Sequence, residues 1–140
     1  MVDPFPNLAA EIPLLETKLY LPRWRSDLVS RPRLVARLGQ GIEGRLTLIS
    51  APPGFGKTTL LAEWLASAGA DRLSAGWVSL DRGDDDPMLF WTYVVTALQR
   101  ARPGVGAGAL AMLQSPQPPP IEAVLTTMIN EIGAVEGDTA

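Results

Sequence analysis

The 140-residue sequence contains no cysteine and no histidine. The absence of cysteine excludes disulfides and thiolate nucleophiles, and the absence of both residues excludes nearly every zinc or haem site. Imidazole general bases are excluded as well. Any chemistry must therefore depend on carboxylates, lysine, arginine, hydroxyl groups or the backbone.

The sequence also lacks excess positive charge and long apolar runs. Its formal net charge is −3, so no global basic field favours nucleic acid, and we expect no direct nucleic-acid contact by this segment. No run approaches the roughly 18 apolar residues that cross a bilayer, and no basic region precedes an apolar stretch at the N-terminus. We therefore expect a cytoplasmic chain without membrane contact. Its hydrophobic content of 46% suits one ordinary domain with a buried core.

The middle of the chain has the pattern of a strand, a helix and a second strand. The apolar runs at 45–50 and 75–81 predict strands buried on both faces. Between them, TTLLAEWLASAG predicts an amphipathic helix that ends at Gly69. Together they predict a βαβ unit. The expected fold class is α/β, a partial P-loop NTPase with flanking helices and an incomplete parallel sheet.

Three further helices and loops are predicted around this unit. Ser30 is the expected N-cap of a short helix that ends at Gly39, and Asp86 is the expected N-cap of a longer helix. Residues 103–120 are rich in Gly and Pro and predict a loop, followed by a last helix at about 119–132. The longer helix is expected to bury Phe90, Trp91, Val94, Val95 and Leu98. The last helix is expected to bury Val124, Leu125, Met128 and Ile132.

Residues 48–61, LISAPPGFGKTTLL, approach the phosphate-loop (Walker A) motif G-x-x-x-x-G-K-[ST]. In this motif backbone N–H groups and a helix N-terminus surround a phosphate chain. Gly54 and Gly56 would allow close approach of the anion, Lys57 would reach the β and γ phosphates, and the Thr58 hydroxyl would bind Mg²⁺. The departure is Ala51 at the first motif position. The context of strand, turn and helix nevertheless predicts phosphate binding rather than an ordinary turn.

A nucleotide hydrolase also needs a carboxylate near the metal. Asp81, which ends WVSLD, is the candidate in this sequence. The alternative is that Asp84, Asp85 and Asp86 solvate a turn and favour the positive end of the next helix. Arg31 either touches nucleotide or faces solvent, and spacing alone leaves both open.

Five stretches of the sequence together resemble a known family. They are TKLYLPR, LVSRPRLVARL, LTLISAPPGFGKTTLLAEW, GWVSLDRGDDDPMLFWTYVVTALQ and LQSPQPPPIEAVLTTMINEI. In collinear order over residues 15–133, they resemble the start of the large ATP-dependent LuxR-type transcriptional regulators, the maltotriose-activator-like signal-transduction NTPases of the STAND class. Four prolines in residues 1–22 predict an extended N-terminal arm, with a short strand near 17–21. The resemblance implies that 23–140 are the N-terminal portion of an NTPase domain.

The resemblance also implies a ligand and its site. ATP, with Mg²⁺, would act as a switch, and ADP would bind at the same place. The implied binding residues are Ala51, Pro52, Pro53, Gly54, Phe55, Gly56, Lys57, Thr58, Thr59 and Arg31, with the stretch Val29–Arg31 near the adenine. The Walker B acids of such a regulator would follow just after Ala140, so turnover by this chain is expected to be negligible.

The family sheet order implies that the two predicted strands would not pair with each other. We therefore expect an uncovered apolar face, and self-association or docking on a full-length regulator. Two alternatives to a nucleotide-binding regulator segment stay open at this point. One is a small self-contained NTPase or kinase that uses Asp81, and the other is a non-catalytic interaction fragment.

Overall fold

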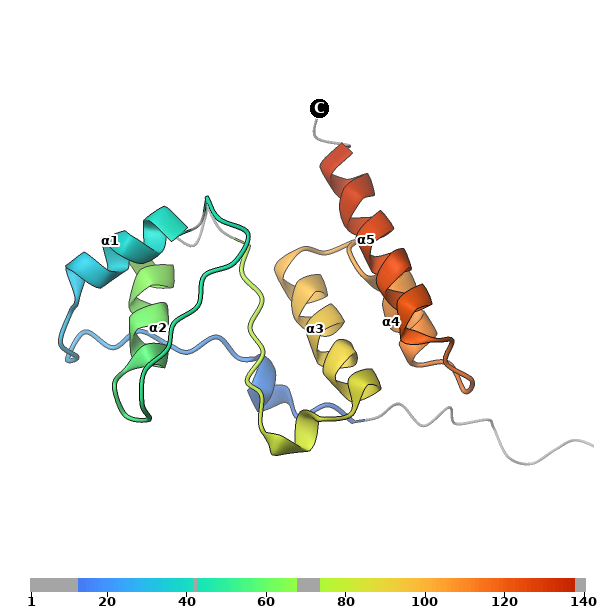
Figure 1. Cartoon of the computed structure of the whole chain (residues 1–140), viewed down its shortest axis with the longest axis horizontal. Coiled ribbons are helices and arrows are strands. Elements are labelled where there is room, and N and C mark those ends of the chain that lie inside the picture. Colours follow the sequence, from blue (N-terminus) through green and yellow to red (C-terminus); the bar gives the residue numbers. More distant parts are fainter. Residues whose placement is uncertain (1–12, 42, 68–73, 138–140) are drawn as a thin grey trace, which may run out of the picture. The chain divides into compact units, whose positions relative to one another are not determined.

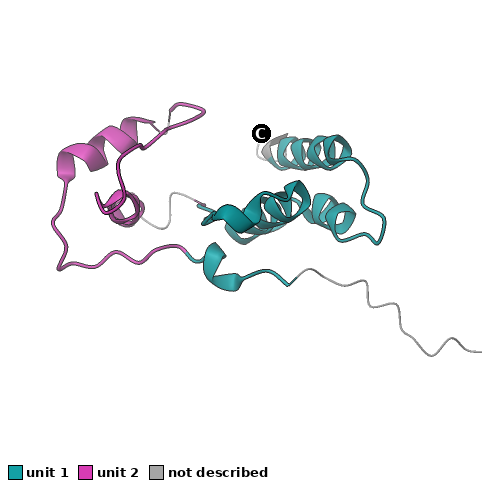
Figure 2. Ribbon diagram, turned by 60° about the horizontal axis from the view of Figure 1, so that its bottom comes forward, with its two compact units in different colours: residues 1–20, 75–140 teal, residues 21–74 magenta. Residues whose placement is uncertain are grey.

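The computed structural model of the chain describes residues 13–41, 43–67 and 74–137 (Figure 1). Its α-helices are α1 (Pro32–Gly41), α2 (Lys57–Ser67), α3 (Pro87–Ala101), α4 (Ala107–Leu113) and α5 (Ile121–Gly137), and two 3-10 turns are η1 (Glu16–Leu19) and η2 (Arg82–Asp84). These ranges contain no β-strand. The chain divides into two compact units, Leu21–Ser74 and Met1–Tyr20 with Ala75–Ala140 (Figure 2).

The prediction of an α/β fold with a βαβ unit and a parallel sheet is wrong. Neither 45–50 nor 75–81 forms a strand in the part of the chain that the structure describes. Leu46 and Leu48 are 88% and 86% exposed, although burial on both faces was predicted. Apolar and β-branched runs favour extended backbone, but a strand also needs a neighbouring segment that supplies ladder hydrogen bonds. The described chain supplies no such ladder to either run.

The short strand predicted near 17–21 is also wrong, because Glu16–Leu19 forms the 3-10 turn η1. Within its own unit, this segment accepts a backbone hydrogen bond from Ser79 N at Lys18 O, at 2.8 Å. The Leu15 N–H also donates to the Tyr93 hydroxyl on α3 at 2.9 Å. Residues 1–12 of the predicted arm, and the predicted helix end at Gly69, lie outside the described residues.

Unit Met1–Tyr20 with Ala75–Ala140 is built around α3, which is buried on two sides. One side packs with α4 and α5 in a cluster of Val95, Ala109, Leu113, Val124 and Met128. The other side packs Tyr93 and Ala97 against Leu19 of η1. A single apolar stripe was predicted for α3, so its second buried side was missed. The predicted N-cap is confirmed, since the Asp86 carboxylate accepts hydrogen bonds from the N–H groups of Met88 and Leu89.

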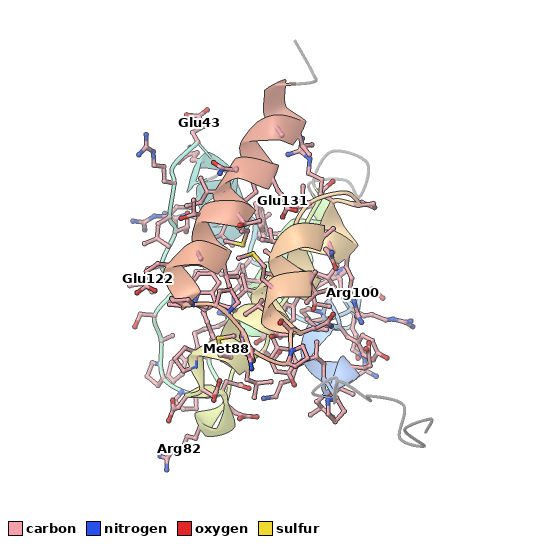
Figure 3. All side chains as sticks on the ribbon, turned by 90° about the vertical axis from the view of Figure 1, so that its right-hand side faces the viewer. Glu43, Arg82, Met88, Arg100, Glu122 and Glu131 are labelled. Carbon is pink, nitrogen blue, oxygen red and sulfur yellow. The ribbon has the colours of Figure 1, made fainter. Side chains whose placement is uncertain are left out.

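Helix α4 lies inside the stretch that was predicted to be a loop. The glycines of VGAGALAML lower helix propensity and favoured the loop prediction. The helix is nevertheless packed on α5, where Glu131 Oε1 accepts a hydrogen bond from Gly108 N at 2.7 Å (Figure 3). Packing and this side-chain bond therefore outweigh the weak local propensity. The last helix was predicted correctly in place, and it extends to Gly137.

In unit Leu21–Ser74, α1 packs against α2. Helix α1 begins at Pro32, so Arg31 rather than the predicted Ser30 occupies the N-cap position, and its carbonyl accepts from Leu34 N and Val35 N. The helix ends at Gly41 rather than Gly39. This unit contains the predicted phosphate loop.

Candidate functional site

The loop before α2 has the backbone shape that its glycines predict. Gly54 and Gly56 have φ values of 83° and 75°, in the left-handed region that favours glycine. Helix α2 begins directly afterwards at Lys57, and Leu60 N donates to Gly56 O at 2.9 Å. The N–H groups of the first helical turn have no carbonyl partner within a helix, and they carry its partial positive charge. The loop therefore leads straight to a helix end suited to an anion.

Lys57 folds back over this loop. Its Nζ donates to Ala51 O at 2.6 Å and to Pro52 O at 3.1 Å. These carbonyls are weaker partners for an ammonium than a charged phosphate oxygen would be. The lysine is thus held at the loop by contacts that an anion can replace.

The other predicted loop residues surround this lysine. Pro52, Pro53 and Phe55 are exposed, and Phe55 N donates to Pro52 O at 3.4 Å. Thr58 is exposed on the first turn of α2, and Thr59 is half-buried. The exposed Thr58 hydroxyl is therefore placed beside the loop and accessible to a ligand.

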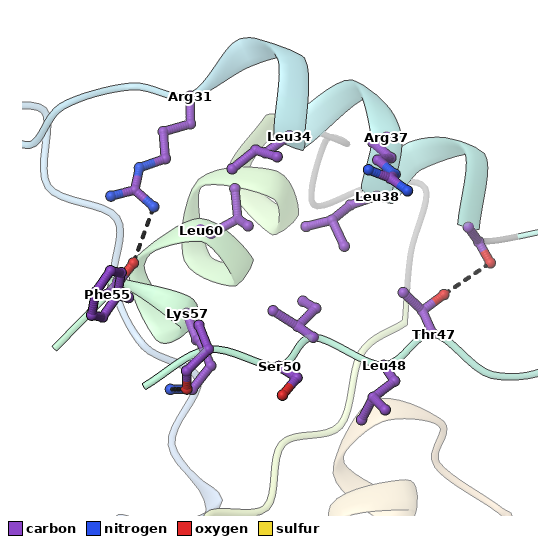
Figure 4. Close-up of a pocket in the computed structure, with 14 residues that line it drawn as sticks. Arg31, Leu34, Arg37, Leu38, Thr47, Leu48, Ser50, Phe55, Lys57 and Leu60 are labelled. Carbon is purple, nitrogen blue, oxygen red and sulfur yellow. Dashed lines mark hydrogen bonds between the residues drawn. The ribbon is translucent and has the colours of Figure 1, made fainter. Parts of the chain in front are cut away.

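Arg31 is brought to the same loop from the start of α1. Its Nη1 donates to Phe55 O at 3.0 Å, as Figure 4 shows. Arg31 is exposed and its guanidinium lies against the loop backbone, so both sequence-based interpretations of Arg31 stay open. Two cationic side chains, Arg31 and Lys57, therefore contact backbone carbonyls of one loop.

Glu63 is the residue of this site that sequence reasoning missed. It is only 9% exposed. Its carboxylate accepts hydrogen bonds from the Ser30 hydroxyl and from Arg31 N, the latter at 3.2 Å to each oxygen. The available signal was that Glu63 is the single acidic residue of helix α2, where its immediate neighbours Ala62 and Trp64 are apolar or aromatic. A carboxylate on the buried face of a helix needs such donors.

Two pockets adjoin the loop within this unit. The larger, of about 580 Å³, lies between α1 and the segment 47–51, and its lining includes leucine and arginine side chains together with Phe55, Gly56 and Lys57 of the loop (Figure 4). The smaller, of about 220 Å³, is lined by Leu28, Val29, Arg31, Gly54, Gly56, Thr59, Leu60 and Glu63. Gly54 and Gly56 line the smaller pocket, and Gly56 and Lys57 line the larger one, so both pockets meet the start of α2.

Asp81, the predicted alternative metal ligand, has a structural role in the other unit. Its carboxylate caps η2 by accepting from Gly83 N at 2.8 Å, and it forms an ion pair with Lys18 at 2.9 Å. The hydrogen bond from Lys18, followed by the one from Gly83, lowers the pKa of Asp81. Hydrogen bonds to Asp84 and then to Asp81 raise the pKa of Lys18. Within the described ranges, no group of three or more acidic side chains is arranged to hold a metal ion.

Comparison with known proteins relates the chain to transcriptional regulators. The HTH-type transcriptional regulator MalT of Cronobacter sakazakii is 36% identical over 121 residues, which are 86% of this chain. MalT of Yersinia enterocolitica is 37% identical over 124 residues, and MalT of Yersinia pestis is 36% identical over 124 residues, both covering 89% of this chain. Most of this chain is therefore homologous to part of MalT.

The match spans 13% of the length of each of these MalT proteins. No family model matches the chain. The homology supports the predicted relationship to LuxR-type regulators, and it supports the interpretation of this chain as a segment related to transcription regulation. Among the helices of the described ranges, none is both long enough and apolar enough to cross a membrane.

Proposed function

We propose that this chain is the ATP-binding segment of a transcriptional regulator related to MalT, with the loop Ala51–Gly56 and the start of α2 holding the phosphates. The observation that carries the proposal is the left-handed backbone of Gly54 and Gly56 immediately before the N-terminus of α2. Left-handed residues directly before a helix N-terminus are a feature of loops whose N–H groups bind anions. Homology to MalT supports the regulator as its context.

Lys57 would add charge to this backbone cradle. Its Nζ donates to two loop carbonyls. Exchange of these neutral acceptors for phosphate oxygens would give stronger, charge-assisted hydrogen bonds. Binding would therefore release Lys57 from Ala51 O and Pro52 O, with little rearrangement of the backbone.

Thr58 is the residue that fits a magnesium ion bound with the nucleotide. Mg²⁺ is usually held by few protein oxygens together with phosphate oxygens and water, and the exposed Thr58 hydroxyl at the first turn of α2 suits that arrangement. The ion would neutralise phosphate charge beside the loop. The Asp81 carboxylate is engaged by Lys18 and Gly83, so we propose nucleotide binding as a switch rather than turnover at Asp81.

Calorimetric titration with ATP and Mg²⁺ tests the proposal. Lys57→Ala should weaken ATP binding by about 10- to 100-fold, because it removes a charge-assisted contact of roughly 1.5–3 kcal/mol. Arg25→Ala is the control, since Arg25 is exposed in the same unit and lines neither pocket. Equal affinity in wild type and Lys57→Ala would refute the assignment of the phosphates to this loop.

A further inference from the structure

The buried carboxylate of Glu63 joins two parts of the candidate site. It projects from α2, the helix whose N-terminus ends the phosphate loop. Its oxygens accept from the Ser30 hydroxyl and the Arg31 N–H, which lie just before α1. These contacts hold the Ser30–Arg31 backbone against the helix that carries the loop.

Arg31 contacts Glu63 with its backbone and the loop with its side chain. While Arg31 N is bonded to Glu63, Arg31 Nη1 is bonded to Phe55 O in the loop. The guanidinium is also near Gly56, since a Cβ on that glycine would lie 3.7 Å from Arg31 Nη2. The orientation of Arg31 over the loop thus depends on the backbone position that Glu63 fixes.

The smaller pocket brings Glu63 together with the loop glycines and the segment before α1. Gly54, Gly56 and Thr59 of the loop and α2 line it together with Leu28, Val29 and Arg31 of the segment that Glu63 holds. A group attached to a phosphate chain at Gly54 and Gly56 would therefore have the segment 28–31 within reach in the same pocket. The apolar side chains there suit the base or sugar of a nucleoside better than further phosphate.

We propose that Glu63 is a positioning residue for the nucleoside end of the bound nucleotide. It acts by fixing Ser30 and Arg31 at the edge of the pocket, whereas the loop and Lys57 hold the phosphates. This inference rests on the proposed nucleotide-binding function. It predicts that Glu63 contributes to affinity for ATP but not to affinity for a phosphate chain without a nucleoside.

Titrations of the whole chain with ATP and with inorganic tripolyphosphate, both with Mg²⁺, separate these contributions. Glu63→Ala should weaken ATP binding by roughly tenfold and leave tripolyphosphate binding within about twofold of wild type. Glu63→Gln retains a side-chain oxygen acceptor and should restore most of the ATP affinity. Glu43→Ala, an exposed acid in the same unit, is the control for the change of charge and should alter neither affinity.

The outcomes distinguish this inference from the proposed function. Equal loss of both affinities in Glu63→Ala, or no loss of either, would overturn the role of Glu63. Lys57→Ala should weaken both ligands, and a failure of that variant to weaken either would overturn the phosphate assignment instead. Absence of ATP and tripolyphosphate binding by the folded wild-type chain would overturn both.

A second variant covers the case in which Glu63→Ala does not fold. Ser30→Ala removes only the hydroxyl donor to Glu63 and keeps the carboxylate bond to Arg31 N. It should weaken ATP binding by about threefold and leave tripolyphosphate binding unchanged. A Ser30→Ala chain with the wild-type ratio of the two affinities would contradict the proposal.

Discussion

At the scale of single residues, the chain uses its two lysines in different ways. Lys57 donates to two loop carbonyls, which are contacts that an anion can replace. Lys18 is instead enclosed by permanent partners, with a side chain only 13% exposed, ion pairs to Asp81 and Asp84, and the ring of Tyr93 at 5.3 Å. Lys57 is therefore available to a ligand, whereas Lys18 stabilises the fold.

The ion pair between Lys18 and Asp84 yields a stability prediction. The Asp84 side chain is 4% exposed and accepts from Lys18 at 2.7 Å with both oxygens. Asp84→Asn removes the buried negative charge opposite the lysine and should lower the thermal midpoint by several degrees. Asp85→Asn at the exposed neighbouring position should leave it unchanged. Equal midpoints in the two variants would contradict a stabilising role of this pair.

The ion pair between Lys18 and Asp81 predicts how the stability of the fold depends on pH. Because the pKa of Asp81 is lowered from 3.8, its contribution is present above that pH and is lost as the pH falls through the lower, folded-state pKa. The pKa of Lys18 is raised from 10.5, so its contribution is present below that pH and is lost as the pH rises through the higher pKa. The thermal midpoint should fall less in Lys18→Met than in wild type, both when the pH is lowered through the pKa of Asp81 and when it is raised through the pKa of Lys18. Parallel curves would exclude Lys18 as the source of this dependence.

At the scale of elements, the parts that sequence predicted correctly are those with local causes. Asp86 is followed by Pro87 and caps α3, and Gly56-Lys57 marks the start of α2. These features depend on a few neighbouring residues, so a linear pattern is sufficient to predict them. The left-handed loop backbone at Gly54 and Gly56 likewise depends on local sequence.

The elements that sequence missed depend on distant partners. The strands at 45–50 and 75–81 were predicted from composition alone, which carries no information about a pairing partner. Helix α4 was missed because its glycines favour a loop, whereas packing on α3 and α5 stabilises it. Glu63 was missed for a similar reason, since its donors Ser30 and Arg31 are more than thirty residues away.

The packing of α5 on α3 and α4 yields a prediction for that element. Val124 is fully buried in the helical cluster, while Ile129 on the same helix is 64% exposed. Val124→Ala should lower the free energy of unfolding by about 2 kcal/mol, because it removes buried methyl groups and leaves a cavity. Ile129→Ala should change it by less than about 0.5 kcal/mol. Urea unfolding followed by circular dichroism measures both, and equal effects would contradict the observed packing.

At the scale of the whole molecule, large apolar side chains remain exposed. Leu46 and Leu48 are both more than four-fifths exposed in a segment that has no strand partner in the described ranges. Exposed apolar side chains beside unpaired backbone groups favour association with another chain. We therefore propose that the free chain self-associates through this segment or docks on a longer regulator.

Sedimentation velocity at increasing protein concentration tests this association. The wild-type sedimentation coefficient should rise with concentration, and the double variant Leu46→Glu, Leu48→Glu should remain monomeric because it adds repulsive charge to the segment. Leu80→Glu, at a 57% exposed position in the other unit, is the control. A wild-type chain that stays monomeric throughout would contradict the proposed association.

The central claim is that the loop before α2 binds the phosphates of ATP. Backbone amide chemical shifts of the ¹⁵N-labelled chain, recorded during titration with ATP and Mg²⁺, test it most directly, because the loop N–H groups would be the ligands. We predict that the largest shift changes occur in residues 54–59, and that α5 amides remain unchanged. Saturation of the chain with ATP without shift changes in residues 54–59, or with changes confined to α3, α4 and α5, would contradict the claim.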